Sequence, residues 1–133
     1  MVPYWPDIAK ERTDAQEDIQ FADAFCVLRK VVFSRTLDSA EGNTRIVRAN
    51  LRGEMLELKQ EQGKNILAGG VDIPSQRIAI GLVDEFRFVV WPVIAGQGRR
   101  LMEGMNLQEK LQLRLADSRV FKSGAIALRY WKP

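Results

Sequence analysis

Two adjacent glycines, Gly69 and Gly70, follow the apolar run Ile66–Ala68 and precede a segment with helical character. Glycine has no Cβ, so another group can approach its backbone closely, and it adopts dihedral angles that are closed to other residues. A helix that starts after such a turn directs its free N–H groups and positive dipole end at whatever occupies the turn, most favourably an anion. Lys64–Asp72 is therefore predicted to be a short buried strand that ends in a phosphate-holding turn. An empty Gly-Gly corner is the alternative, and the glycines alone favour it, because the complete GxGxxG fingerprint is absent.

A second group of residues suited to an anion follows the β-branched and aromatic run Val31–Phe33. Arg35 can hold a phosphate through two parallel N–H bonds, and Ser34 and Thr36 can donate their hydroxyls to the same group. A solvated surface arginine is an equal alternative for Arg35 taken alone.

A third loop, Pro92–Gly98, closes another strand-like run. Gly96 and Gly98 permit a close loop, and Arg99 and Arg100 lie nearby for a second anion; a mobile loop with solvated arginines is the alternative. Ligands of an open α/β sheet bind beyond the carboxyl ends of its strands. Because all three loops follow predicted parallel strands, together they indicate one site.

No residues for acid–base or metal catalysis present themselves, so catalytic residues stay unassigned and no metal site is predicted. The chain has no histidine, and Asp84 and Glu85 are adjacent on a predicted strand and so point to opposite faces. Asp72 is interpreted as a helix cap rather than a catalytic group. Cys26, the single cysteine, is interpreted as a buried structural thiol, since no histidine can activate it. Any redox step must belong to a cofactor.

Composition places the chain among ordinary globular proteins. Its 133 residues suit one domain with a core of its own. The formal net charge is +3, but the basic residues are scattered, so no nucleic-acid partner is predicted. No apolar run approaches a membrane span and no signal-peptide pattern is visible, so no membrane association is expected. One cysteine rules out an internal disulfide framework and is consistent with the cytoplasm.

Hydrophobic periodicity predicts strands that alternate with helices, which implies parallel pairing and a sheet covered by helices. Asn50 is expected to cap the second helix, and Lys122–Gly124 to join the last two strands as a hairpin. The predicted helices cover Ile19–Leu28, Leu51–Gln62 and Asp72–Ile80, and the predicted strands cover Val31–Phe33, Thr44–Arg48, Ile66–Ala68, Asp84–Val93, Leu111–Phe121 and Ala125–Trp131.

The N-terminal residues give a weaker pattern. Pro3 and Pro6 argue against a helix interior in Met1–Pro6. The charged segment Asp7–Asp18 is predicted to be a solvated loop or a loose helical turn.

Taken in order, these segments resemble the dihydrofolate-reductase-like proteins. More closely, they are similar to the reductase domain of the bacterial bifunctional riboflavin-biosynthesis deaminase-reductase. The resemblance covers essentially the whole chain and implies a single domain over residues 1–133. Its fold is α/β, with a mostly parallel sheet flanked by helices and a C-terminal antiparallel hairpin. The segments that carry it are Val32–Leu37, Asn43–Arg45, Gly69–Gly70, Gly81–Glu85, Pro92–Leu101, Ser118–Phe121 and Gly124–Tyr130.

The resemblance implies an NADPH-dependent reductase of this type, acting on a small heterocyclic or pteridine-like substrate. If active, it would be similar to 5-amino-6-(5-phosphoribosylamino)uracil reductase or to dihydrofolate reductase. The other hypotheses are a non-catalytic nucleotide-binding or structural oligomer and a binder of a phosphorylated metabolite.

The resemblance also implies roles for individual residues. Ser34, Arg35 and Thr36 would hold the adenosine ribose and its 2′-phosphate, and the Gly-Gly peptide, often cis in the family, would face the pyrophosphate. The residues implied at the pyrophosphate and nicotinamide ribose are Gly69, Gly70, Val71, Asp72 and Ile73, and those implied at the substrate are Pro92, Val93, Gly96 and Gly98.

The sequence departs from the family at its N-terminus. Met1 aligns after the first strand, loop, helix and second strand of the family, so the chain is expected to be truncated or to start at an internal methionine of a longer one. The two absent strands would flank the strand at Ile66, and their loss would leave backbone edges unpaired. We therefore expect a homodimer or a higher homo-oligomer.

Overall fold

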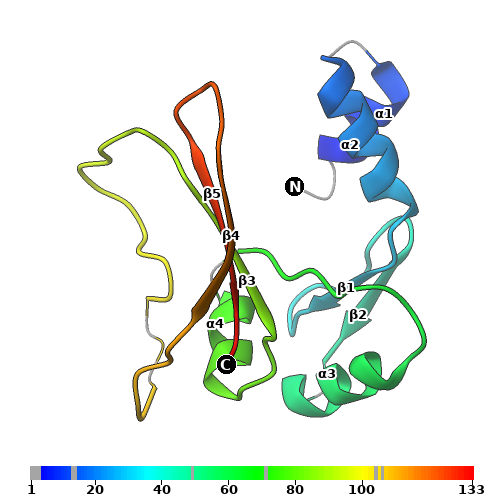
Figure 1. Cartoon of the computed structure of the whole chain (residues 1–133). Helices are drawn as coiled ribbons and strands as arrows, with labels where there is room; N and C mark the ends of the chain where they lie inside the picture. Colours follow the sequence, from blue (N-terminus) through cyan, green and yellow to red (C-terminus); the bar gives the residue numbers. More distant parts are fainter. Residues whose placement is uncertain (1–3, 13–14, 49, 71, 104, 106) are drawn as a thin grey trace. The chain divides into compact units, whose positions relative to one another are not determined.

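The computed structural model describes residues 4–12, 15–48, 50–70, 72–103, 105 and 107–133 and shows a mixed α/β chain (Figure 1). It divides into two compact units, Met1–Glu54 and Met55–Pro133, and each is described by itself. The α/β class agrees with the sequence prediction, and the single domain over 1–133 stays a prediction. Across the described residues, no helix has the length and apolar character that a membrane span requires.

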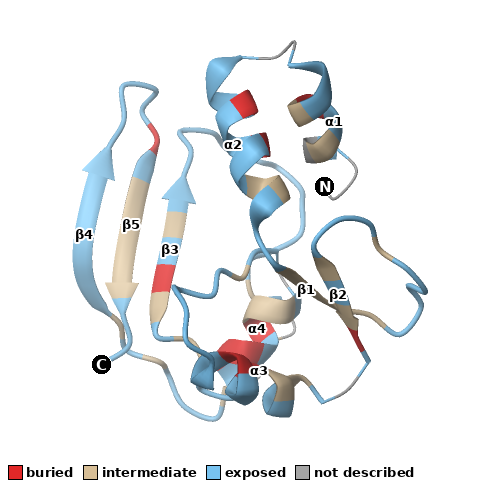
Figure 2. Cartoon of the chain, turned by 90° about the vertical axis from the view of Figure 1, so that its right-hand side faces the viewer, coloured by how far each residue is buried: buried red, intermediate tan, exposed pale blue. Residues whose placement is uncertain are grey.

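Two helices, α1 (Tyr4–Glu11) and α2 (Gln16–Val27), begin the first unit. They pack around Ile8, Ile19 and Ala22, which are all buried (Figure 2). Of the two alternatives predicted for Asp7–Asp18, the helical turn agrees with α1, whereas the solvated loop does not, because Ile8 is buried. Pro6 lies in the first turn of α1. Backbone N–H groups in the first turn of a helix have no acceptor within the helix, so a proline there removes no helical hydrogen bond.

The strands β1 (Lys30–Phe33) and β2 (Thr44–Val47) complete the first unit and confirm the two predicted there. They pair in parallel, from Lys30 opposite Thr44 to Phe33 opposite Val47. Parallel pairing brings the carboxyl ends of both strands to the same edge.

The helix α3 (Leu51–Gln60) is capped as predicted. The Oδ1 atom of Asn50 accepts a 2.9 Å hydrogen bond from the N–H of Arg52. Met55 and Leu58 are buried as expected, whereas Leu56 is 41% exposed and does not face inward.

The second unit contains α4 (Asp72–Ala79), which also matches its prediction. Pro74 lies in its first turn, and Gly81, at φ +73°, follows its end in the left-handed conformation that glycine tolerates. Arg77 is buried on this helix, and desolvation lowers the pKa of its guanidinium.

The second unit also contains a three-stranded antiparallel sheet, in the order β3-β5-β4 (Figures 1 and 2). Its strands are β3 (Glu85–Val90), β4 (Arg114–Val120) and β5 (Ile126–Trp131). The N–H of Gly124 donates to Phe121 O at 2.9 Å and closes the predicted hairpin turn. The sheet is therefore not mostly parallel in the described part of the chain, where only β1 and β2 pair in parallel.

The predicted strand Ile66–Ala68 is absent. Ile66 is 44% exposed and Leu67 is 85% exposed, and neither belongs to a strand. A strand exists only where a neighbour satisfies its backbone groups, and no described segment pairs with this one. The interpretation of this run as buried was wrong.

Candidate functional site

The loop after β1 is shaped by Ser34. Its N–H donates to Val47 O at 3.2 Å, which extends the parallel pairing by one residue. Its Oγ atom accepts hydrogen bonds from the N–H groups of Thr36 at 3.3 Å and Leu37 at 3.0 Å. This is a serine turn, in which a side-chain oxygen takes the place of a backbone acceptor. Ser34 therefore fixes the path of the loop and keeps its hydroxyl hydrogen for another acceptor.

Arg48, at the end of β2, clamps the same loop. Its Nη2 atom donates to Leu37 O at 2.8 Å and to Asp38 Oδ1 at 3.2 Å. Arg35 is exposed and joins no ion pair with another residue that the structure describes. The neighbouring carboxylate is thus engaged by Arg48, while the Arg35 guanidinium is available to an anion. Sequence reasoning did not select Arg48, although its place at the carboxyl end of a strand parallel to β1 was a usable signal.

The Gly69–Gly70 turn is exposed and open. A Cβ built on either glycine would meet no atom within 4 Å, so a ligand group can reach the backbone from that side. Gly70 has φ +88°, which a side chain would strain. The described residues contain no cis peptide bond, so the cis Gly-Gly peptide that the resemblance implied is not observed. Val71, also predicted to contact the cofactor, lies outside the described residues.

An ion pair joins the start of α4 to the Arg-rich loop. The Nη2 atom of Arg99 lies 2.5 Å from Asp72 Oδ1, and its Nε atom lies 3.8 Å from Glu103 Oε2. The Gly69–Gly70 turn and the loop that carries Arg99 were predicted to lie near each other at the ends of neighbouring strands. The salt bridge places Arg99 next to Asp72, but no strand precedes the glycine turn. Ile73, the remaining predicted residue of this turn, is half-buried.

The residues predicted to border the substrate are on the surface. Pro92, Val93, Gly96 and Gly98 are all exposed, with Val93 at 73%. The turn between β4 and β5 lies against Pro92, since a Cβ built on Gly124 would lie 3.2 Å from Pro92 Cγ.

The predicted site residues therefore fall in both units. Ser34, Arg35 and Thr36 belong to the first unit and form one loop there. The glycine turn and the segment 92–100 belong to the second unit.

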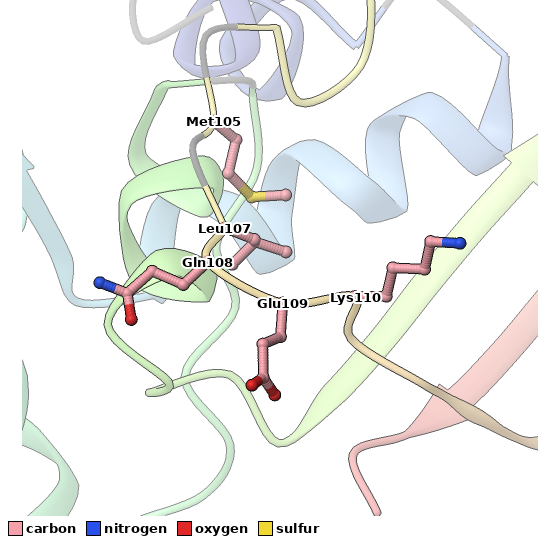
Figure 3. Close-up of a pocket in the computed structure, with 5 residues that line it drawn as sticks. All are labelled: Met105, Leu107, Gln108, Glu109 and Lys110. Carbon is pink, nitrogen blue, oxygen red and sulfur yellow. The ribbon is translucent and has the colours of Figure 1, made fainter.

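A shallow hollow of about 390 Å³ lies elsewhere in the second unit. One continuous stretch lines it, and the polar ends of Gln108, Glu109 and Lys110 extend in different directions (Figure 3). Its lining residues are Met105, Leu107, Gln108, Glu109 and Lys110. None of the predicted site residues is among them, and polar groups that diverge do not converge on a ligand.

Comparison with known protein families identifies the family of this chain. The family model of the RibD C-terminal domain matches residues 3–127. The chain belongs to the RibD C-terminal domain family. The resemblance drawn from the sequence is thereby confirmed over nearly the whole chain.

Two uncharacterised proteins of Bacillus subtilis (strain 168) are related in sequence to this member of the RibD C-terminal domain family. YyaP is 34% identical over 103 residues, which are 77% of this chain and 54% of YyaP. YwjB is 32% identical over 85 residues, which are 62% of this chain and 49% of YwjB. The chain thus spans about half the length of the curated relatives it matches.

Solved structures share the fold. A protein from Shewanella sp. PV-4, described as a riboflavin biosynthesis protein, has a TM-score of 0.69 at 17% identity, over 89% of this chain and 71% of that one. A pyrimidine reductase-like protein from Corynebacterium diphtheriae has a TM-score of 0.55 at 18% identity, over 76% of this chain and 48% of that one. At these identities the likeness shows the fold alone, which agrees with membership of the RibD C-terminal domain family.

Proposed function

We propose that this protein is an NADPH-dependent reductase that transfers hydride to a small heterocyclic or pteridine-like substrate. The observation that carries the proposal is the loop after β1, where Ser34 and Arg48 fix the backbone and Arg35 is exposed. An arginine that is free to form two parallel N–H bonds suits the 2′-phosphate that distinguishes NADPH from NADH. Membership of a family with reductase-like structural neighbours supports the same reaction class.

The residues present fit such a cofactor in their chemistry. The exposed backbone at Gly69 and Gly70 allows a pyrophosphate to approach N–H groups at the start of α4. When bound, NADPH supplies the hydride, and the chain binds and orients it. We propose that the segment 92–98 borders the substrate. We also propose that the protein acts in the cytoplasm.

Titration of NADPH fluorescence tests the cofactor assignment. Arg35→Ala removes charge-assisted bonds to the 2′-phosphate and is expected to weaken NADPH binding by about tenfold or more. Arg52→Ala, at an exposed arginine of α3, is the matched control and should leave binding unchanged. NADH, which lacks the phosphate, should bind both variants and the parent chain equally. No binding at sub-millimolar NADPH would contradict the proposal.

A second candidate is a nucleotide-binding or structural protein that keeps the fold without turnover. Ile66 and Leu67, which precede the glycine turn, are exposed and pair with no described strand. This favours the second candidate, because a precise hydride-transfer geometry needs a rigid support. NADPH that binds in an Arg35-dependent manner, but is not oxidised by pyrimidine, pteridine or flavin-precursor substrates, would select this candidate.

A further inference from the structure

Arg48 holds a carboxylate that belongs to the proposed cofactor loop. Its Nη2 atom donates to Leu37 O at 2.8 Å and to Asp38 Oδ1 at 3.2 Å. Among the described residues, Arg48 is the one ion-pair partner of Asp38, whose side chain is 97% exposed. Arg48 directly follows β2, and parallel pairing places this strand end beside the end of β1, where the loop begins. The contact therefore joins two neighbouring strand ends within the first unit.

The loop after β1 carries side chains that suit two different cofactors. An arginine in such a place accommodates the 2′-phosphate of NADPH, whereas an aspartate hydrogen-bonds the ribose 2′-hydroxyl of NADH. Here Arg35 and Asp38 lie in one loop, and the turn at Ser34 keeps that loop compact. A free Asp38 carboxylate would repel the 2′-phosphate and would also compete with it for Arg35. The preference of the loop therefore depends on whether this carboxylate is free.

We propose that Arg48 is a positioning residue that sets the preference for NADPH over NADH by holding the Asp38 carboxylate. The inference rests on the proposed function and adds to it a residue that determines cofactor specificity. Arg48 neutralises the charge of Asp38, and its hydrogen bond to Leu37 O ties the preceding backbone to the end of β2. The carboxylate is thereby kept from Arg35 and from the ribose hydroxyl. Arg48 needs no contact with the cofactor for this effect.

Fluorescence titration with NADPH and with NADH tests this role through the ratio of the two affinities. Arg48→Ala frees Asp38 and should lower the ratio of NADPH affinity to NADH affinity by about fivefold or more at low salt. Arg48→Lys keeps a positive charge beside Asp38 and should retain most of the ratio. A general loss of folding would weaken both cofactors together and leave the ratio unchanged.

The ion pair between Arg12 and Asp23 in the same unit supplies a matched control. Its N–O distance is 3.1 Å, and the arginine side chain is 53% exposed, as it is in Arg48. It joins the end of α1 to α2 and involves no residue of the cofactor loop. Arg12→Ala removes the same charge as Arg48→Ala and should leave the ratio of affinities unchanged.

Asp38→Asn separates the carboxylate from the positive charge that Arg48→Ala also removes. In the parent chain this substitution should change the ratio by less than about twofold, because Arg48 already neutralises the carboxylate. In the Arg48→Ala background it should restore most of the lost preference for NADPH. Equal effects of Asp38→Asn in the two backgrounds would overturn the inference, since they would show that Arg48 and Asp38 act independently.

The same titrations distinguish a failure of this inference from a failure of the proposed function. A parent chain that binds NADPH with a ratio independent of Arg48 would overturn the inference and leave the proposed function in place. A parent chain that binds neither cofactor at sub-millimolar concentration would contradict both. Circular dichroism of each variant checks that the chain is folded under the conditions of the titration.

Discussion

Two arginines near the proposed anion-binding residues form ion pairs with carboxylates of the chain itself. Arg99 is shared between Asp72 and Glu103, while Arg48 engages Asp38 and leaves Arg35 without an ion pair among the described residues. An exposed pair of this kind contributes little to stability, because water and salt screen it. The carboxylate of Asp72 would act more directly on an anion bound at this turn. It lies at the start of α4, where the helix dipole attracts negative charge, and it repels that charge.

Replacing Asp72 with asparagine should therefore strengthen anion binding at this turn. We expect NADPH affinity to rise about two- to threefold at low salt, because a like charge is removed and Arg99 is released. Fluorescence titration at two ionic strengths measures the change, which should shrink as salt rises. Glu57→Gln, an exposed position on α3, is the control. Weaker binding by the Asp72 variant would show that the carboxylate itself assists the cofactor.

Ser34 should act through loop geometry. Ser34→Ala removes the acceptor for the N–H groups of Thr36 and Leu37, and we expect NADPH affinity to fall several-fold with little change in thermal stability. Ser34→Thr keeps the oxygen and should retain most of the affinity. Equal loss in both variants would mean that the turn hydrogen bonds are not what matters.

For single residues, the sequence indicated which residues have the chemistry to bind an anion better than it indicated which residues contact one another. Arg35 and the Gly69–Gly70 turn could be chosen from their chemistry and spacing. Arg48 was missed although it directly follows a strand parallel to β1. The pairing of Asp72 with Arg99 could not be predicted, because salt bridges between distant segments depend on tertiary structure that no local pattern encodes.

Elements whose ends carry local signals were predicted closely. The Asn50 cap marked the start of α3, and Gly81 marked the end of α4. The β-branched and aromatic run Val31–Phe33 located β1, and the alternation of polar and apolar residues located β2. The failures came where a tertiary partner decides the conformation. Ile66–Ala68 is apolar enough for a strand but has no described neighbour, and Pro6 is compatible with α1 only because it falls in the first turn.

The cap of α3 makes a direct test at this scale. Asn50→Ala removes the Oδ1 acceptor of the Arg52 N–H and should lower the free energy of unfolding by about 1 kcal/mol. Thermal or urea denaturation measures it. Gln62→Ala, just beyond the end of the helix, should have little effect, and equal loss at both positions would rule out a capping effect.

The end of α4 makes a second test. Gly81→Ala forces a residue with a Cβ into φ +73° and should destabilise the fold by about 1–2 kcal/mol. Gly63→Ala is the matched control, since that glycine has no positive φ and a Cβ there would meet nothing within 4 Å. Urea denaturation of the two variants should show a lower midpoint for Gly81→Ala alone.

For the whole molecule, the homo-oligomer expected from the sequence predicts stability that depends on protein concentration. If copies of the chain associate, association stabilises the folded chain by mass action, so the melting temperature should rise with concentration. Differential scanning fluorimetry over a hundredfold range of concentration measures this dependence, and a melting temperature independent of concentration would argue against association.

The β-bulge in β4 has a consequence for length variation in this family. Leu115 faces Tyr130 and Asp117 faces Arg129, so Ala116 alone has no opposite residue on β5. Removing Ala116 would leave every cross-strand pair and both faces as they are. Removing Ser118 would bring Asp117 opposite Leu128, so its charge would move to the face of the sheet that carries Leu115 and Val120. Relatives with a shorter strand here are therefore expected to carry their single-residue gap at Ala116.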